Sequence, residues 1–300
     1  MGTIIADYPS GLKKKAEKEK TNLVEFYDEA TEDYEFWSKD FNMHFGYYIP
    51  FRTNIFRRDS MLNEMNSQVL KRLGLTEKKT VIADLGCGMG GTMRYALKKR
   101  KQWSAMGVTL SEEQVKNGNR FLKDHAGAIV NANYNHTSFK SNSFNGAVAI
   151  ESFCHSGHNS KSFAEAFRIL KPNGRLVVAD AFLKKEPEKL CIGSHFGYKQ
   201  LCNSWSLERL GSIHQVVAEM KNIGFKDIRV EDISFRVAPS VLHVPFAIVG
   251  FALRKLVKNG YLKRQSINNL KGSFFALLCG LHLKSFGYYL ITGTKSEKEK

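Results

Sequence analysis

The run of residues 81–91, VIADLGCGMGG, constrains the fold more than any other part of the chain. Its apolar first half has the composition of a strand and ends on Asp84, and glycines follow at positions 86, 88, 90 and 91. Glycines allow a sharp turn and a close approach of the backbone to a ligand. Residues 92–100 are typical of a helix, whose N-terminus presents free N–H groups and the positive end of the helix dipole. The run therefore predicts the nucleotide-binding corner of a doubly wound α/β fold.

The core of the chain continues as an alternation of strands and helices. The apolar pattern predicts strands over 80–84, 103–109, 128–132, 144–151, 174–181, 225–235 and 285–294. It predicts helices over 58–73, 92–100, 159–170 and 207–223, and one more that Ser111 caps at its N-terminus. Strands interleaved with helices imply right-handed crossovers between parallel strands. We therefore expect a doubly wound, mostly parallel, seven-stranded Rossmann-like sheet.

The chain divides into five segments by composition. The helical pattern of 21–38 and the aromatic stretch after it would suit a lid over a small-molecule site, and 239–284 interrupts the alternation with apolar helices flanked by Lys and Arg. The expected segments are a basic flexible arm (1–20), an N-terminal helical lid (21–75), a ligand-binding α/β core (76–238), a helical cap inserted before the last strand (239–284), and the last strand with a charged tail (285–300).

The overall composition limits the compartment and the partners. The net charge of +16 suits a polyanion or an anionic membrane surface, although a solvated lysine-rich surface gives the same value. The five cysteines form no C-x-x-C pair, which is typical of reduced thiols in the cytosol. The sequence shows neither a signal peptide nor an apolar run long enough to span a bilayer. We expect a cytoplasmic protein, with peripheral attachment to a membrane as an option.

Four local motifs resemble those of the class I S-adenosylmethionine (SAM)-dependent methyltransferases. They are DLGCGMGG at 84–91, GVTLSEEQ at 107–114, the pair NANY and SFKSNSFN within 131–145, and LKPNG at 170–174. In this order and spacing they are specific to the superfamily. Residues 21–235 are most similar to the sterol and tocopherol C-methyltransferases, with other small-molecule methyltransferases and the cyclopropane synthases more distant. The resemblance does not fix the acceptor.

The resemblance implies SAM as cofactor, S-adenosylhomocysteine (SAH) as its product, and no metal. It places Asp84 near the ammonium end of SAM. Many relatives hold the ribose with an acid at the end of the second strand, but Thr109 and Leu110 stand there, so the resemblance assigns Gln114 to this part of the site. Asn133 stands where many relatives have Asp at the adenine amino group, and an amide oxygen can accept that N–H equally well.

Aromatic residues ahead of the core complete the expected cofactor site. Tyr27 and Tyr47 lie in stretches that resemble the family's cofactor-covering segment, and aromatic faces suit a sulfonium cation. The full set of expected cofactor residues is Asp84, Gly86, Cys87, Gly88, Gly90, Thr109, Leu110, Gln114, Asn133, Tyr134, Tyr27 and Tyr47.

The expected catalytic residues follow the fourth predicted strand, at the carboxyl edge where ligands bind in such folds. Residues 149–155, AIESFCH, resemble the A-I-E-A-x-x-H stretch of the sterol enzymes, which points to Glu151 and His155. His155 could act as a general base toward an oxygen or nitrogen nucleophile. Glu151 could stabilise a carbocation or orient a hydroxyl. His158 is a weaker second candidate, and a lone histidine is more often structural.

The function implied is methyl transfer from SAM to a lipophilic small molecule of sterol, prenyl-quinol, polyketide or alkaloid type, at carbon or oxygen. The charge raises RNA methylation as an alternative, but neither an N/D-P-P-Y/F motif nor a Pro-Cys motif follows the fourth strand, so nucleic acid is not the favoured partner. A non-catalytic SAM-fold module at a membrane is a third reading, against which the intact glycine turn argues. The oligomeric state stays open.

The segment 239–284 is expected to wall the acceptor site and to touch a membrane. Its apolar stretches are flanked by basic residues, which is the pattern of an interfacial segment on anionic lipid. Packing on the sheet without lipid contact is the equally weighted alternative. The basic residues concerned are Arg254, Lys255, Lys258, Lys263 and Arg264.

Overall fold

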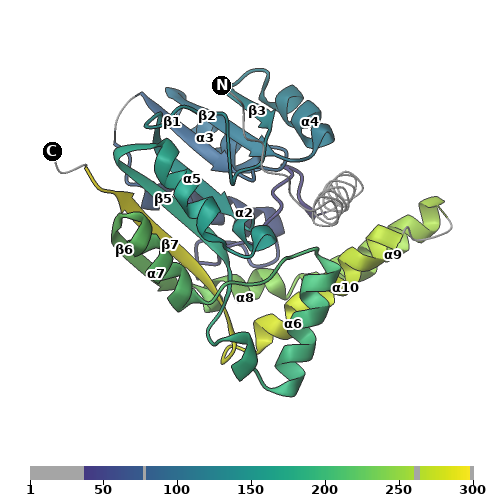
Figure 1. The fold of residues 1–300 in the computed structure, drawn as a ribbon. Helices are drawn as coiled ribbons and strands as arrows, with labels where there is room; N and C mark the ends of the chain where they lie inside the picture. The colour runs from purple at the N-terminus through teal and green to yellow at the C-terminus, as the bar shows by residue number, and fades with distance from the viewer. Residues whose placement is uncertain (1–36, 77–78, 260–263, 298–300) are drawn as a thin grey trace, which may run out of the picture.

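The computed structural model describes residues 37–76, 79–259 and 264–297, and it contains a seven-stranded sheet (Figure 1). The strand order is β3-β2-β1-β4-β5-β7-β6, with β7 antiparallel to both of its neighbours and the other pairs parallel. The predicted doubly wound, mostly parallel seven-stranded fold is therefore confirmed. The strands are β1 (Thr80–Leu85), β2 (Trp103–Thr109), β3 (Gly127–Asn131), β4 (Phe144–Ile150), β5 (Leu170–Leu183), β6 (Phe225–Asp232) and β7 (Phe286–Lys295).

The described helices begin and end largely where capping residues stand. Ser111 Oγ accepts from Gln114 N at the start of α4, and left-handed glycines at 74 and 224 end α2 and α7. The helices are α2 (Arg58–Leu73), α3 (Gly91–Lys99), α4 (Glu112–Leu122), α5 (Ser160–Ile169), α6 (Ile192–Ser204), α7 (Ile213–Ile223), α8 (Ser234–Val241), α9 (Val244–Asn259) and α10 (Arg264–Leu281), with short 3-10 turns η1 (Phe153–Ser156) and η2 (Pro187–Lys189).

The sheet is covered on both faces. On one face, side chains of α2, α3 and α4, among them Met65, Leu73 and Met93, pack on β1 and its neighbours. On the other face, α5 and α7 contribute Phe163 and Met220 to a second core. Strand order reverses between β1 and β4, so the carboxyl ends of these two strands form the switch point where ligands bind in open α/β sheets.

The structure corrects three predicted elements and adds one. β6 ends at Asp232 rather than at 235, because Ser234 already begins α8. α7 begins at Ile213 rather than at 207, because Leu207 and Leu210 are buried against α6 instead of continuing the helix. β5 begins at Leu170, ahead of the predicted 174, because Leu170 already pairs with Phe144. α6 has no counterpart among the predicted helices. The predicted helix over 21–38 falls almost entirely outside the described residues, as do the arm 1–20 and Tyr27.

The cap is helical, as predicted, and begins at Ser234, ahead of the expected 239. Figure 1 shows α9 and α10 reaching beyond the edge of the α/β core, and α10 packs along α6. The stretch Ser234–Arg254 is long and apolar enough to cross a membrane by length and composition alone, with a mean hydropathy of 1.5. The prediction that no run reaches this length is wrong, because it counted only uninterrupted apolar residues. The Val, Ile, Leu, Phe and Ala side chains keep the mean hydropathy high in spite of interruptions such as Ser240 and Gly250.

Candidate active site

The glycine turn fixes the floor of the site at the end of β1. Gly86 N and Cys87 N both donate to Val108 O at 3.0 Å, which fastens the turn to β2. Gly86 has a φ of 92°, and a Cβ there would lie 2.4 Å from Ser152 Cβ, so this position needs glycine on two grounds. Gly90, with a φ of 75°, is the N-cap of α3. The turn thus places its backbone against the end of β4.

A small polar cavity of about 100 Å³ opens above this turn. It collects residues from the ends of β1, β2 and β4 and from the start of α4, as the switch point requires. Sequence-predicted cofactor residues that line it are Asp84, Gly86, Cys87, Gly88, Thr109, Leu110, Gln114 and Tyr134, and both predicted catalytic residues, Glu151 and His155, reach it as well.

Three buried polar atoms of this cavity have no hydrogen-bond partner among the described residues. They are Asp84 Oδ2, Gln114 Nε2 and Asn42 Nδ2. Burial raises the pKa of Asp84 to about 7. The Gln114 side chain is oriented by Thr109 Oγ1, which donates to Gln114 Oε1 at 2.7 Å. Buried polar atoms are rarely left unpaired. One carboxylate acceptor and two amide donors are therefore available for a polar ligand that carries a positive and a negative charge.

Three predicted cofactor residues that the structure describes do not line this cavity. Tyr47 is buried in the core that α2 forms with the sheet. Asn133 is exposed, and its Oδ1 accepts from Asn135 N at 2.9 Å, so the acceptor expected at adenine is already engaged. Gly90 lies behind the turn, with Ile129 Cδ1 3.1 Å from where its Cβ would be. Tyr27 lies outside the described residues. The lining therefore gives no support to a cofactor role for Tyr47, Asn133 or Gly90.

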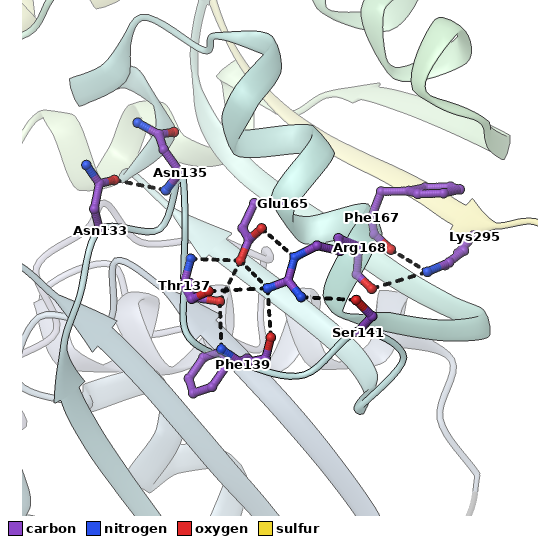
Figure 2. A network of polar contacts seen from close by, with 9 residues as sticks. All are labelled: Asn133, Asn135, Thr137, Phe139, Ser141, Glu165, Phe167, Arg168 and Lys295. Atoms are coloured by element: carbon purple, nitrogen blue, oxygen red, sulfur yellow. Dashed lines mark hydrogen bonds and ion pairs between the residues drawn. The ribbon is translucent and has the colours of Figure 1, made fainter. Parts of the chain in front are cut away.

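Figure 2 shows why the loop after β3 keeps its shape. Glu165 Oε1 accepts from Thr137 N at 2.8 Å and from Thr137 Oγ1 at 2.6 Å, and Arg168 Nη2 donates to Phe139 O at 2.7 Å. This network on α5 fixes the loop, which carries Tyr134. The Tyr134 hydroxyl donates to Ser152 O at 2.9 Å, so the ring is held at the cavity wall.

The cavity is covered by residues 40–48, a segment we call the strap. Its members Phe41, Asn42, Met43 and His44 line the cavity, and none of them was predicted as a cofactor residue. The signal was present in the aromatic stretch 41–48, but the resemblance to a cofactor-covering segment and the suitability of an aromatic face for a sulfonium pointed to Tyr47. Which side chain of an irregular segment faces a ligand depends on anchors elsewhere in the chain.

Asn66 of α2 is the anchor of the strap. It is fully buried, donates from Nδ2 to Asn42 Oδ1 at 3.0 Å, and its Oδ1 lies 2.8 Å from Thr92 Oγ1 and 3.1 Å from His44 Nε2. Further along, Phe45 N donates to Glu151 Oε1 at 2.6 Å and Gly46 N donates to Ser240 Oγ at 2.8 Å. The strap therefore joins the glycine turn, the end of β4 and α8.

Replacement of Asn66 by Ala is expected to weaken cofactor binding by more than destabilisation of the fold alone would explain. It leaves polar groups of the strap and of Thr92 unpaired, each at roughly 1–3 kcal/mol. We expect SAH affinity to fall about tenfold or more and the unfolding midpoint to fall. Calorimetric titration and thermal unfolding measure the two effects, with Asn63→Ala, half-buried on the same helix, as control. Unchanged SAH affinity in Asn66→Ala would show that the strap does not cover the cofactor.

A second, larger and mostly apolar cavity of about 360 Å³ adjoins the first. Helices α6, α8, α9 and α10 supply most of its wall, with the ends of β5 and β7. Its aliphatic and aromatic lining includes Leu201, Trp205, Val237, Ile248, Phe251 and Leu277. The residues shared by both cavities are Met43, His44, Glu151 and His155, so these four mark the place where the two ligands would meet.

Glu151 stands at the junction in a constrained conformation. It follows β4 with a φ of 47°, which directs its side chain toward the strap. Glu151 Oε1 accepts from Phe45 N at 2.6 Å and from the Tyr288 hydroxyl at 2.8 Å. Burial raises the pKa of Glu151 to about 8. A carboxyl group poised near neutrality beside an apolar cavity is suited to act on a proton or on a positive charge.

The two histidines differ in what they can do. Burial lowers the pKa of His155, which lies in η1, to about 4, so its ring is neutral and a weak proton acceptor near pH 7. His158 is built into the core: its Nδ1 accepts from Gly211 N at 3.0 Å, its Nε2 lies 3.2 Å from Asp180 Oδ2, and its ring stacks on Phe182. His158 is therefore structural. In the part of the chain that the structure describes, no group of three His, Cys, Asp or Glu could hold a metal ion.

Comparisons with known proteins agree with this geometry. Residues 83–178 match the family model described as a methyltransferase domain. The chain is 30% identical over 226 residues to 24-methylenesterol C-methyltransferase 2 of Arabidopsis thaliana (73% of this chain, 60% of the relative), and 27% identical over 237 residues to the chloroplastic tocopherol O-methyltransferase of the same plant (73% and 67%). A mycolic acid cyclopropane synthase solved with SAH and CTAB has the same fold, with a TM-score of 0.79, 18% identity, and 92% and 98% coverage.

The matched residues include the glycine turn and the end of β4, which border the switch-point cavity. Within the core of this chain, residues 83–178 match a methyltransferase domain, and the sheet has the fold of the SAH-bound cyclopropane synthase. The chain spans about 60% of the length of the first sterol methyltransferase to which it is similar.

Proposed function

We propose that this protein transfers a methyl group from SAM to a lipophilic small-molecule acceptor. The observation that carries the proposal is the junction of a polar cavity with a larger apolar one at Glu151 and His155. When bound, SAM supplies an electrophilic methyl group. The residues around the junction then determine which acceptor atom meets that group and in what environment.

The polar cavity suits the charged end of SAM. The unpaired carboxylate oxygen of Asp84 is suited to an ammonium group, and the unpaired Nδ2 of Asn42 can donate to a carboxylate. Gln114, held by Thr109, can donate from Nε2 to a hydroxyl. These complementary groups support SAM as the cofactor and SAH as its product.

The apolar cavity positions the acceptor and excludes water from it. Orientation and desolvation can supply most of the rate of an in-line displacement. Glu151 is the group best placed to take a proton from the acceptor or to stabilise positive charge on it, since its carboxyl lies at the junction and titrates near neutrality. His155, neutral at physiological pH, is proposed to contact the acceptor rather than to act as a strong base.

The acceptor class is supported by the cavity and by the relatives. Relatives are named for 24-methylenesterol and tocopherol, both lipophilic, and their methyl transfers are to carbon and oxygen respectively. We propose a sterol, prenyl-quinol, polyketide or alkaloid type of acceptor for this chain. The net charge of +16 favours RNA as the alternative, but an apolar wall offers a ribonucleotide few partners.

We also propose that the protein is cytoplasmic and peripheral on anionic membrane. The basic composition and the five free cysteines support this placement. Fractionation of cells expressing the full chain tests it, since a peripheral protein leaves the membrane fraction in high salt.

The methyl transfer itself is tested in two steps. Calorimetric titration of the purified chain should show binding of SAM and of SAH. Incubation with SAM and a panel of sterols, prenylated quinols and RNA should then add the mass of one methyl group to a lipophilic member and not to RNA. Methylated RNA would favour the alternative, and SAM binding without any product would favour a non-catalytic module.

A further inference from the structure

The cap exposes an apolar surface on the side away from the acceptor cavity. On α9, Phe246, Val249, Leu253 and Val257 recur at helical spacing and are 80%, 59%, 59% and 88% exposed. We call these four residues the α9 stripe. α10 exposes Phe274 and Leu278, neither of which lines the cavity, in the same manner. Isolated exposed apolar residues are ordinary, but a stripe on each of two neighbouring helices marks an interaction surface.

α9 is a single-helix wall between this surface and the acceptor cavity. Its inner residues Val244, Ala247, Ile248 and Phe251 line the cavity, while the α9 stripe lies on its outer face. A helix with its side chains is about 10 Å across. Whatever covers the stripe therefore lies within about one helix diameter of the proposed acceptor.

The charge of the cap indicates which kind of surface it would bind. Residues 234–284 contain no Asp or Glu. A surface that combines an apolar stripe with basic residues and no acid is complementary to anionic lipid, where apolar burial and electrostatic attraction add. The Lys and Arg of this stretch are Arg236, Arg254, Lys255, Lys258, Lys263, Arg264, Lys271 and Lys284.

The cap is built to lie on a bilayer rather than to cross it. The stretch Ser234–Arg254 is broken between α8 and α9, and α8 is fixed to the core, since Tyr48 N donates to Arg236 O and Tyr288 N donates to Ser234 Oγ. The remaining helix, α9, has 16 residues, so its length is about 24 Å. The hydrocarbon core is about 30 Å thick.

We propose that the α9 stripe, with the exposed apolar side chains of α10, inserts into the surface of an anionic membrane, so that the acceptor reaches its cavity past α9 without crossing water. The route rests on the proposed function, whereas the lipid contact does not. The lipid contact thus lies on the outer face of one helix whose inner face is the wall of the site.

Vesicle sedimentation tests the contact without requiring turnover. The full chain should sediment with phosphatidylcholine–phosphatidylserine vesicles at low salt, and much less with phosphatidylcholine alone. The triple variant Phe246→Asn, Val249→Asn, Leu253→Asn should bind the anionic vesicles at least about tenfold more weakly, because apolar burial is lost. Its SAH affinity should stay unchanged, since these side chains line neither cavity.

Two double variants that remove the same charge test whether vesicle binding depends on the charge of the cap or on the net charge of the protein. Arg254→Gln with Lys271→Gln should weaken binding clearly, whereas Lys98→Gln with Lys99→Gln, exposed on α3, should not. Three outcomes would overturn the proposal. They are wild-type protein that does not bind anionic vesicles, an equal loss of vesicle binding in both double variants, and a dimer in solution that buries the α9 stripe. Retention on the membrane in high salt and alkaline carbonate would indicate a span and overturn it as well. Absence of methyl transfer would contradict the proposed path of the acceptor past α9, but it would not affect the conclusion on vesicle binding.

Discussion

Asp84→Asn is expected to reduce SAH affinity by about 30-fold or more while raising the stability of the unliganded protein. The substitution removes the buried charge that would pair with the ligand's ammonium group, and loss of one partner of such a pair is worth 2–5 kcal/mol in other proteins, roughly 30-fold or more. In the unliganded protein the same charge is destabilising, because Asp84 Oδ2 is buried without a partner among the described residues.

The pH dependence follows from the raised pKa. The pKa of Asp84 is about 7 in the folded protein against 3.8 as the ordinary value. The folded state therefore holds this proton more tightly, so its contribution to stability is present below pH 3.8 and is lost as pH rises through 7. The loss above pH 7 is on the order of 4 kcal/mol. Asn avoids it, and at pH 8 the unfolding midpoint should rise by about 3 °C or more.

Ligand binding should show the opposite pH trend. Asp84 must ionise to pair with the ammonium group, so wild-type SAH affinity should fall about tenfold for each pH unit below 7. The trend should vanish in Asp84→Asn. Calorimetric titration between pH 5 and 8 measures the affinities, and thermal unfolding supplies the stability. Full SAH affinity in the Asn variant would remove Asp84 from the site. Gly86→Val is a poorer test, because its side chain would clash with Ser152 whether or not a ligand binds.

The elements that the sequence predicts well are those with local causes. The strand over 80–84, the cap at Ser111 and the helix over 58–73 each depend on a few neighbouring residues. Each stands within one residue of where it was expected. The cofactor residues on these elements, such as Gln114, reach the cavity because sheet topology brings strand ends together.

What the sequence could not provide is the outcome of distant contacts. Asn42 rather than Tyr47 reaches the cofactor cavity because Asn66, far along the chain, holds the strap in one register. Asn133 is exposed outside the cavity, and its oxygen accepts from Asn135 N. The low pKa of His155 is a consequence of burial by surrounding elements, which a local motif does not reveal. Such features follow from tertiary packing.

Glu151→Gln is expected to lower turnover by about 100-fold or more with little change in SAH affinity. Gln keeps an oxygen that can accept from Phe45 N and from the Tyr288 hydroxyl, so the strap stays anchored while the charge is removed. Charge that develops on the acceptor during methyl transfer then loses its buried counterpart, and electrostatic groups of this kind account for about 100- to 1000-fold in other enzymes.

The pH profile identifies the form of Glu151 that works. Burial raises its pKa to about 8 in the unliganded protein, and a bound sulfonium cation favours the carboxylate and lowers this value. Wild-type turnover should therefore rise with pH to a plateau whose midpoint lies below 8, and Glu151→Gln should lack this rise. Tyr288→Phe, which removes one donor to the carboxylate, should shift the midpoint upward and lower turnover less.

Comparison with His155 decides between charge stabilisation and simple positioning. His155→Gln should lower turnover less than Glu151→Gln, because an imidazole with a pKa of about 4 accepts a proton poorly at neutral pH. A larger loss in His155→Gln would make His155 the proton acceptor. Full turnover in both variants would mean that the walls of the two cavities supply the rate through orientation and exclusion of water, with Glu151 serving only to anchor the strap.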